Sequence, residues 1–320
     1  MSLIEQAAKR LEQLRQAGVE LPESKTAIDT PTPVDRPGRH QVLGGIPGMS
    51  DSPLLKPKPT DEAPETPPAK PSAVSKQVDI NLEAISAAGL LVPNATRSKM
   101  ADEYRVIKRP LIANAMGKGV PRVANGNLIM VTSALPGEGK SFSAINLAIS
   151  IAMELDNTVM LVDADVARPS VLNMLGLPPA RGLLDAVDQD SVDISDVLLR
   201  TNIEKLSILP SGTQHQRATE LLASAAMVRL LHDMASRYPD RIIIFDSPPL
   251  LLTTEARALA THMGQVVMVV HAGQTAQSAV KDAVNAIEAC PIKMMILNQS
   301  REVGAAGYGY GYGYGYGQNA

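Results

Sequence analysis

The sequence predicts an α/β protein whose mostly parallel sheet is flanked by helices. From Leu128 onward, short apolar runs alternate with longer helical segments, which is the order of elements in parallel sheets. The runs are apolar on both faces, as strands covered by helices on both sides are. The expected strands are 128–133, 158–163, 205–209, 241–246, 265–270 and 293–298.

The composition excludes several classes of protein. Hydrophobic residues make up 45% and charged residues 20% of the 320 residues, which is the composition of a globular chain. The single cysteine, Cys290, allows no internal disulfide and indicates a reducing, cytoplasmic setting. No apolar run reaches the ~18 residues of a membrane span, and the first residues do not resemble a signal peptide. The net charge of −3 favours no nucleic acid partner.

Two segments are expected before the globular domain. Residues 1–18 are interpreted as an amphipathic docking helix, because apolar residues follow helical spacing from Ile4 to Leu14. This helix, over 2–17, would dock to a protein partner, to a second copy or, less in keeping with its mixed charge, to a membrane surface. Residues 19–77 contain half of the 24 prolines and are interpreted as a disordered linker.

The domain itself is expected over 78–300. Its first part, 78–127, should contain two helices, one within 79–92 that ends near Gly89 and one over about 100–116 that Pro110 ends or bends. The α/β core is expected over 128–300, and a flexible tyrosine-rich tail over 301–320.

A phosphate-binding loop is predicted after the first strand of the core. Residues 134–141 read Ala-Leu-Pro-Gly-Glu-Gly-Lys-Ser, between a predicted strand and a predicted helix. Glycines let backbone N–H groups approach phosphate oxygens, and the helix N-terminus adds positive potential. Lys140 would contact the β and γ phosphates, and the Ser141 hydroxyl would ligate Mg²⁺. An ordinary Gly-rich turn is the alternative, and Ala134 replaces the first glycine of the usual pattern.

Two further strands end in aspartates. One apolar run ends in Asp163-Ala-Asp165, and another ends in Asp246. Carboxylates at the carboxyl ends of parallel strands lie where such sheets bind ligands, and such an aspartate commonly positions Mg²⁺ or its water. Each could instead be a solvated acid, but three strand ends that supply these groups together indicate a nucleotide site.

The tail alternates tyrosine with glycine. Its phenols belong to Tyr308, Tyr310, Tyr312, Tyr314 and Tyr316. Glycine keeps the chain flexible, so any of them could reach an active site, and each phosphate would add about −1.5 to −2 charge. An adhesive low-complexity tail is the alternative.

These motifs resemble those of the bacterial tyrosine kinases. Residues 134–141 are similar to the family's Walker A motif, 159–165 to Walker A′, 242–249 to Walker B and 308–316 to its tyrosine cluster. The resemblance covers about 100–320 and implies a P-loop NTPase fold. The N-terminal helix, the linker and the Glu-Tyr-Arg-Val-Ile-Lys-Arg-Pro-Leu segment resemble the exopolysaccharide-associated branch found with exosortase-type gene clusters.

The resemblance implies a role for each matching residue. Asp163 would orient or deprotonate the attacking tyrosine, and Asp165 would support the metal. The implied catalytic residues are Lys140, Asp163 and Asp165. The implied metal ligands are Ser141, Asp163 and Asp246. The implied nucleotide-binding residues are Pro136, Gly137, Glu138, Gly139, Lys140, Ser141, Phe142 and Asn298, the last being an adenine contact or simply a turn residue. Asp102, Arg105 and Lys108 approximate the family's acid-x-x-Arg-x-x-Arg interface helix, and a charged helix face is the alternative.

Two positions depart from related patterns. The family often has arginine two residues after the second Walker A′ aspartate, where this chain has Ala167 followed by Arg168. The partitioning and cell-division ATPases carry a lysine five positions before the catalytic lysine, where this chain has Leu135. The second departure argues against their dimeric ATPase mechanism.

The resemblance therefore implies a Mg-ATP-dependent tyrosine autokinase that phosphorylates its tail in trans. It would regulate the polymerisation or export of an exopolysaccharide and its chain length. Its expected partners are further copies in a ring, the cytoplasmic segment of a membrane adaptor or polysaccharide co-polymerase, and a phosphotyrosine phosphatase, with no nucleic acid. It would be cytoplasmic and peripheral at the inner membrane. The alternatives are a nucleotide switch with an association tail and a ParA- or MinD-like ATPase.

Overall fold

The computed structural model describes residues 75–93, 98–121, 123–189, 191–237 and 240–300. The expected docking helix at 2–17, nearly all of the expected linker and the tyrosine tail lie outside these residues. No helix among the residues described has both the length and the apolar composition to cross a membrane.

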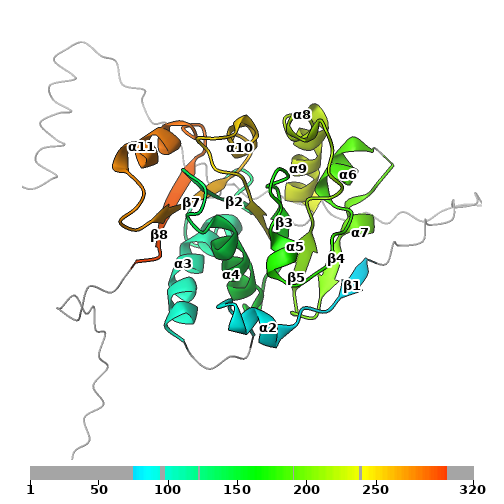
Figure 1. Cartoon of the computed structure of the whole chain (residues 1–320), viewed down its shortest axis with the longest axis horizontal. Helices are drawn as coiled ribbons and strands as arrows, with labels where there is room; N and C mark the ends of the chain where they lie inside the picture. Colours follow the sequence, from blue (N-terminus) through cyan, green and yellow to red (C-terminus); the bar gives the residue numbers. More distant parts are fainter. Residues whose placement is uncertain (1–74, 94–97, 122, 190, 238–239, 301–320) are drawn as a thin grey trace, which may run out of the picture. The chain divides into compact units, whose positions relative to one another are not determined.

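The described residues form an eight-stranded, mostly parallel sheet (Figure 1). The strand order is β1-β4-β5-β3-β6-β2-β7-β8, and the β4–β5 pair is antiparallel. The strands are β1 (Lys76–Val78), β2 (Leu128–Ser133), β3 (Thr158–Asp163), β4 (Leu199–Thr201), β5 (Leu206–Leu209), β6 (Arg241–Asp246), β7 (Gln265–His271) and β8 (Ile292–Asn298).

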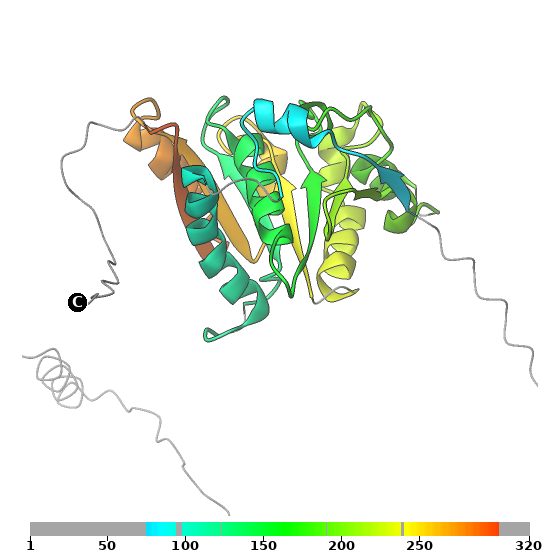
Figure 2. The same ribbon diagram turned by 90° about the horizontal axis from the view of Figure 1, so that it is seen from below.

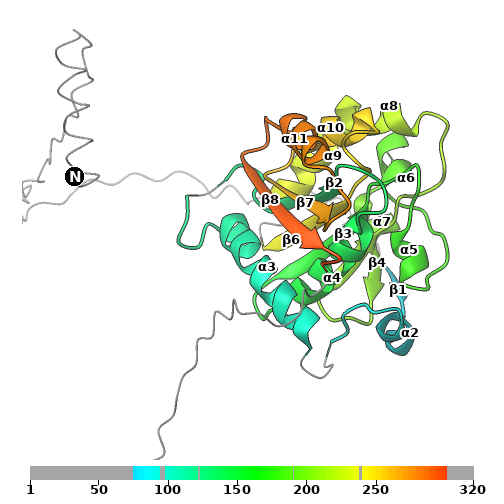
Figure 3. The ribbon, with the colours of Figure 1, turned by 60° about the vertical axis from the view of Figure 1, so that its left-hand side comes forward.

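Helices cover both faces of the sheet, which makes three layers (Figures 2 and 3). One face packs against α2 (Leu82–Ala87), α3 (Lys99–Met116), α4 (Lys140–Ala152) and α5 (Val171–Met174). The other packs against α6 (Leu183–Asp188), α7 (Ile194–Val197), α8 (Ala218–Leu222), α9 (Ala225–Arg237), α10 (Thr254–Ala260) and α11 (Gln277–Asn285).

The alternation of side chains explains why the central strands are apolar throughout. In β2, Leu128 and Met130 face one layer of helices, whereas Ile129 and Val131 face the other. All four side chains are fully buried. Cys290 is buried as well.

The expected fold class and the six expected strands are confirmed, with ends shifted by at most one residue. Strands β1 and β4 were not expected. Lys76 and Gln77, which the sequence assigned to the linker, pair with Leu199 and Arg200 in β4. A strand of three residues is too short to contain an apolar run. Strands β1 and β4 are therefore formed by pairing with each other and cannot be predicted from their own sequences.

Of the two N-terminal helices, α3 matches the expected 100–116 to within one residue, whereas α2 does not match its expected length. Helix α2 is shorter than predicted, and Gly89 follows it with a φ of 83°. Helix α3 continues through Pro110, which neither ends it nor prevents Leu111 from being fully buried. A proline removes one helical hydrogen bond, and the packing of α3 on α4 offsets that loss.

Candidate active site

The three predicted motifs meet at one edge of the sheet. Strand β6 lies between β3 and β2, and the register places Asp163 beside Asp246 and Asp246 beside Val131. Since all three strands run parallel, their carboxyl ends meet at this edge, as expected for a ligand site of this fold class. Lys140 enters from the loop after β2 as the first residue of α4.

The loop after β2 has the backbone of a phosphate cradle. Gly137 and Gly139 have φ values of 82° and 92°, which glycine adopts at little cost. At Gly139 an added Cβ would lie 2.1 Å from the Asn298 side-chain nitrogen, so another residue would displace that side chain and also adopt a strained φ. The Asn298 amide donates to the carbonyl of Glu138 at 2.9 Å. Asn298, the last residue of β8, thus lies against the loop and supports it.

The Glu138 side chain is buried in the protein and does not face the space where a nucleotide would bind. It is buried, and its carboxylate accepts a hydrogen bond from the Leu135 N–H at 2.7 Å and another from the Thr275 hydroxyl. The Glu138 side chain therefore ties the loop to the segment after β7. The Phe142 side chain, in the first turn of α4, is partly buried and packs against the core.

The Lys140 ammonium lies among the aspartates. Its Nζ is 2.6 Å from Asp165 Oδ2 and 3.8 Å from Asp246 Oδ1. Burial lowers the pKa of Lys140, but the charges of Asp246 and Asp165 outweigh burial and leave it above its ordinary value. The ammonium is therefore charged at neutral pH, as phosphate binding requires.

Some carboxylate oxygens of the buried aspartates accept no hydrogen bond from the residues described. Neither carboxylate oxygen of Asp246, nor Oδ1 of Asp163, accepts a hydrogen bond from the part of the chain that the structure describes. Burial raises the pKa of Asp163 to about 7, with a further contribution from Asp246. Burial also raises the pKa of Asp246 to about 6, against the opposing effect of Lys140.

These oxygens fit a magnesium ion shared with nucleotide phosphates. Mg²⁺ prefers oxygen ligands and is held in such sites by one or two carboxylates together with phosphates and water. The buried Asp246 oxygens and the Ser141 hydroxyl, which accepts a hydrogen bond from Ser170 at 2.9 Å, are ligands of that kind. The described residues contain no group of three or more His, Cys, Asp or Glu that could hold a metal.

A cavity of about 410 Å³ opens above the loop. It lies between the phosphate loop, the segment after β3 and the segment after β6, and we call it the phosphate cavity. Its lining residues are Pro136, Gly137, Lys140, Asp165, Ala167, Arg168, Ser170, Pro248, Pro249, Leu252 and Thr253. Arg168 is therefore at the cavity even though Ala167 occupies the position where arginine is common. Ser170 and Thr275 were not predicted, since neither belongs to a motif.

Lys108 does not lie at an outer surface as the interface pattern predicts. It is 3% exposed, its Nζ lies 2.8 Å from Glu154 Oε1, and it donates to the Ser150 carbonyl. Lys108 thus joins α3 to the end of α4 within the chain. Arg105 is exposed and pairs with Asp102 on the same helix. The five tail tyrosines lie outside the described residues.

Comparison with known proteins agrees with this geometry. A family model described as an AAA domain matches residues 126–299, more than half of the chain. The chain is 30% identical over 199 residues to the tyrosine-protein kinase YwqD of Bacillus subtilis, with 62% of this chain and 80% of that protein covered. The chain belongs to the bacterial tyrosine kinase family.

Other members of the family resemble this kinase as well. It is 31% identical over 195 residues to the succinoglycan biosynthesis transport protein ExoP of Rhizobium meliloti, with 60% of this chain covered, but spans only 24% of that protein. The solved kinase domain of VpsO is 26% identical, with a TM-score of 0.53 over 63% of this kinase and 96% of that domain. The chimeric protein CapA2B2 is 25% identical, with a TM-score of 0.54 over 69% of this kinase and 93% of that chain.

Proposed function

We propose that this kinase transfers the γ-phosphate of Mg-ATP to the tyrosines of its own tail, on a neighbouring copy. The observation that supports this most strongly is the meeting of Lys140, Asp165 and Asp246 beside a glycine-lined loop. Family membership supports tyrosine as the acceptor. The proposed acceptors are Tyr308, Tyr310, Tyr312, Tyr314 and Tyr316.

In this proposal the loop from Pro136 to Ser141 binds the phosphates through backbone N–H groups. Lys140 contacts the β and γ phosphates. The nearby carboxylates of Asp165 and Asp246 hold its ammonium group in position. Ser141 and Asp246 hold the metal, which neutralises charge on the phosphates when bound. Asn298, at the end of β8, hydrogen-bonds to the loop. We propose that it also contacts the adenine of ATP.

Asp163 is proposed as the group that receives the phenolic proton. Its Oδ2 accepts backbone N–H groups from Ser170 and Val171, both at 3.0 Å, which leaves Oδ1 for one further partner. Because a phenol has a pKa near 10, its proton must leave as its oxygen bonds to phosphorus. The phenolic oxygen forms the new P–O bond, the bond from the γ-phosphorus to the β–γ bridging oxygen breaks, ADP departs, and the proton passes to Asp163.

The tail could be phosphorylated within its own chain or by a neighbouring copy, because its length allows both routes. Only an experiment can distinguish them. The tail follows β8, and four strand spacings, about 19 Å, separate β8 from β3. Tyr308 lies eight residues past Ser300, and eight extended residues span up to about 29 Å. We propose the trans route, with Asp102 and Arg105 of α3 at the contact between copies in a ring.

The wider role we propose is control of exopolysaccharide polymerisation or export. The name of the relative ExoP, a succinoglycan biosynthesis transport protein, supports this role. We further propose that the kinase acts in the cytoplasm, at the inner membrane, bound to the cytoplasmic segment of a membrane adaptor. A phosphotyrosine phosphatase would reset the tail.

Mass spectrometry after incubation with Mg-ATP tests the proposed reaction. We expect mass increments of one phosphate each, mapped to the five tail tyrosines, in the full chain. Lys140→Met and a truncation after Gly307 should both lack them. Steady ATP hydrolysis without phosphotyrosine, also in the presence of a candidate adaptor segment, would instead favour an ATPase or a nucleotide switch.

A further inference from the structure

Strand β8 forms one edge of the sheet. It is the last strand in the order, and among the residues described it pairs with β7 alone (Figure 3). The strand is seven residues long, carries Lys293 as its single charged residue and contains no proline. Proteins ordinarily protect an edge strand with charges, proline, a short length or a covering segment, because its outward backbone groups attract another strand. Strand β8 has little of the protection that its own sequence could give.

One face of β8 is apolar and exposed. Met294 and Ile296 pack against the core on the side of α3 and α4, so Met295 and Leu297 face the opposite side. Met295 is 58% exposed and Leu297 is 64% exposed. An added strand uses this combination, because the edge supplies backbone hydrogen bonds and the exposed face supplies side-chain contacts.

The outward backbone groups belong to the residues of the exposed face. The Asn298 carbonyl accepts the Ala272 N–H, so the backbone groups of Asn298 point toward the β7 side. Because the direction of these groups alternates along a strand, the N–H and C=O groups of Lys293, Met295 and Leu297 point to the outer edge. The same residues therefore offer both kinds of contact to an added strand.

The chain itself supplies a segment of matching periodicity directly after β8. Residues 308–316 alternate tyrosine with glycine, and residues 301–307 separate them from Ser300. Hairpin loops need only two to five residues, so this spacing allows the chain to reverse. Gln299 has a φ of 56°, a conformation of turns rather than strands, so the chain leaves the direction of β8 there. The tether gives the segment a high effective concentration at this edge.

We propose that the outer edge of β8 binds the chain's own tail as an antiparallel strand whose tyrosines cover Met295 and Leu297. With a period of two, the paired tyrosines share one face and the glycines share the other. The glycines lie on the side of Met294 and Ile296, where they add no bulk next to α3. Aromatic side chains opposite aliphatic ones are favourable cross-strand pairs. A shift of two residues restores the same faces, so several registers are equivalent.

Pairing holds the covered tyrosines away from the phosphate cavity. That cavity lies at the carboxyl ends of the parallel strands, and an antiparallel strand beside β8 runs from this end toward the opposite one. A strand as long as β8 covers at most four of the five tyrosines at a time. The edge of β8 therefore competes with the active site for the tail. This consequence rests on the proposed function, whereas the docking itself does not.

Hydrogen exchange without nucleotide tests the docking. The proteins are the full chain and a truncation after Gly307, and the probes are the backbone amides of β8, followed by NMR. The Met295 and Leu297 amides, which point to the outer edge, should exchange at least tenfold more slowly in the full chain. The Met294 and Ile296 amides, which point toward β7, are the internal control and should agree within twofold. Equal rates at Met295 and Leu297 in the two proteins would overturn the proposal.

A second variant tests whether the tail binds through the apolar face. Met295→Glu combined with Leu297→Glu should abolish the protection of the outer amides in the full chain, with rates corrected for the substituted residues. Both positions are exposed, so the urea midpoint should stay unchanged. Leu155→Glu, at a residue that is 87% exposed, is the matched control and should keep the protection. Protection that persists in the double variant would show that the apolar face does not hold the tail.

The dependence on concentration identifies which tail is bound. Protection by the chain's own tail should stay constant over a tenfold range of protein concentration. Protection that rises with concentration would assign the edge to the tail of another copy and overturn docking within the chain. Because the samples contain no ATP, failure of the docking leaves the proposed function standing, and failure of phosphate transfer leaves the docking standing.

Discussion

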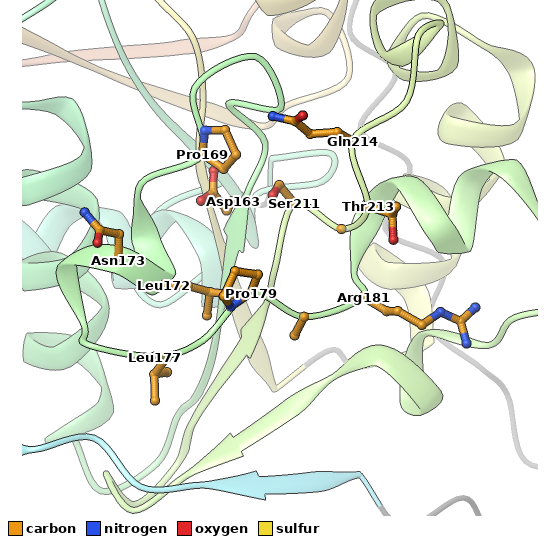
Figure 4. Close-up of a pocket in the computed structure, with 12 residues that line it drawn as sticks. Asp163, Pro169, Leu172, Asn173, Leu177, Pro179, Arg181, Ser211, Thr213 and Gln214 are labelled. Carbon is orange, nitrogen blue, oxygen red and sulfur yellow. The ribbon is translucent and has the colours of Figure 1, made fainter.

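Asp163 and Asp165 have different surroundings although one residue separates them. Asp165 pairs with Lys140 at 2.6 Å and lines the phosphate cavity. Asp163 accepts two backbone N–H groups and lines a separate cavity of about 590 Å³ (Figure 4). The turn after β3 produces this division, because it begins directly after Asp163. The geometry therefore favours a proton acceptor at Asp163 and a partner of the lysine at Asp165.

The raised pKa of Asp163 predicts how stability depends on pH. Burial and the charge of Asp246 raise this pKa to about 7, so the folded state binds the proton more tightly than the unfolded state does. The free energy of unfolding should then fall as pH rises from about 4 to about 7. Asp163→Asn should remove this loss and be more stable than the wild type at pH 7.5, by roughly 2–4 kcal/mol without nucleotide.

Urea denaturation of both proteins at pH 5 and pH 7.5 measures this difference. The same substitution should lower phosphate transfer by about 10²- to 10⁴-fold, the range for losing a general base. If Asp163→Asn is less stable than the wild type at both pH values, burial does not raise the pKa of Asp163 as we infer.

At the scale of elements, the phosphate loop is supported from strands on one side of the sheet. Glu138 bonds to Thr275 after β7, and Asn298 at the end of β8 bonds back to Glu138. These contacts join segments more than a hundred residues apart. The conformation of the loop therefore depends on β7 and β8 as well as on its own glycines.

Glu138→Gln tests this support. The carboxylate accepts the Leu135 and Thr275 hydrogen bonds on different oxygens, whereas an amide has only one acceptor oxygen, so the loop should lose order before nucleotide binds. We expect the Kd for ATP, measured by calorimetry, to rise about tenfold, which corresponds to about 1.4 kcal/mol. Glu204→Gln, at an exposed position, is the control. An unchanged Kd for Glu138→Gln would show that the loop is ordered without this contact.

Helix α3 has an inner and an outer face with different roles. Lys108 on the inner face bonds to Ser150 and pairs with Glu154, whereas Arg105 is exposed. Lys108→Ala should lower the free energy of unfolding by about 2–4 kcal/mol, because it removes a buried, paired charge. Arg105→Ala should cost about 0.5 kcal/mol or less.

Denaturation and sedimentation of the two variants distinguish these faces. Arg105→Ala should weaken self-association, while Lys108→Ala should act on stability. Equal stability losses in the two variants would contradict the division of the helix.

The sequence predicted the central strands and the three motifs because both depend on local patterns. Apolar runs identify buried strands, and glycines and strand-end aspartates identify the phosphate site. Lys108 was placed wrongly because its burial depends on how α3 packs on α4. The cavity beside Asp163 was not foreseen because its walls, at 169–181 and 211–214, are distant in the sequence. They are joined by hydrogen bonds to the Asp185 carboxylate and by backbone hydrogen bonds from Leu183 and Leu184. Strands β1 and β4 are too short to show a pattern.

At the scale of the whole molecule, the chain combines the proposed kinase site at one edge of the sheet with a tail that carries five tyrosines. Phosphorylation of all five would add roughly −8 to −10 charge to a chain whose net charge is −3. Such tails should repel one another across a ring. Assembly would then favour transfer, and transfer would favour dissociation.

Sedimentation before and after incubation with Mg-ATP tests this coupling. We expect the weight-average mass to fall on phosphorylation at low salt, and the fall to shrink at high salt, where charges are screened. A chain with its five tail tyrosines changed to Phe should show no fall. A fall of equal size in that variant would attribute the change to nucleotide binding.

The most direct test of the central claim is to mix two variants that each lack one half of the reaction. One is the full chain with Lys140→Met, which keeps the tail, and the other is the full chain with tail tyrosines changed to Phe, which keeps the site. Intact mass spectrometry after addition of Mg-ATP should find up to five phosphates on the Lys140→Met chain and none on its partner. Phosphate on the wild-type chain but none in the mixture would contradict transfer between copies, and no phosphate on either would contradict the kinase assignment.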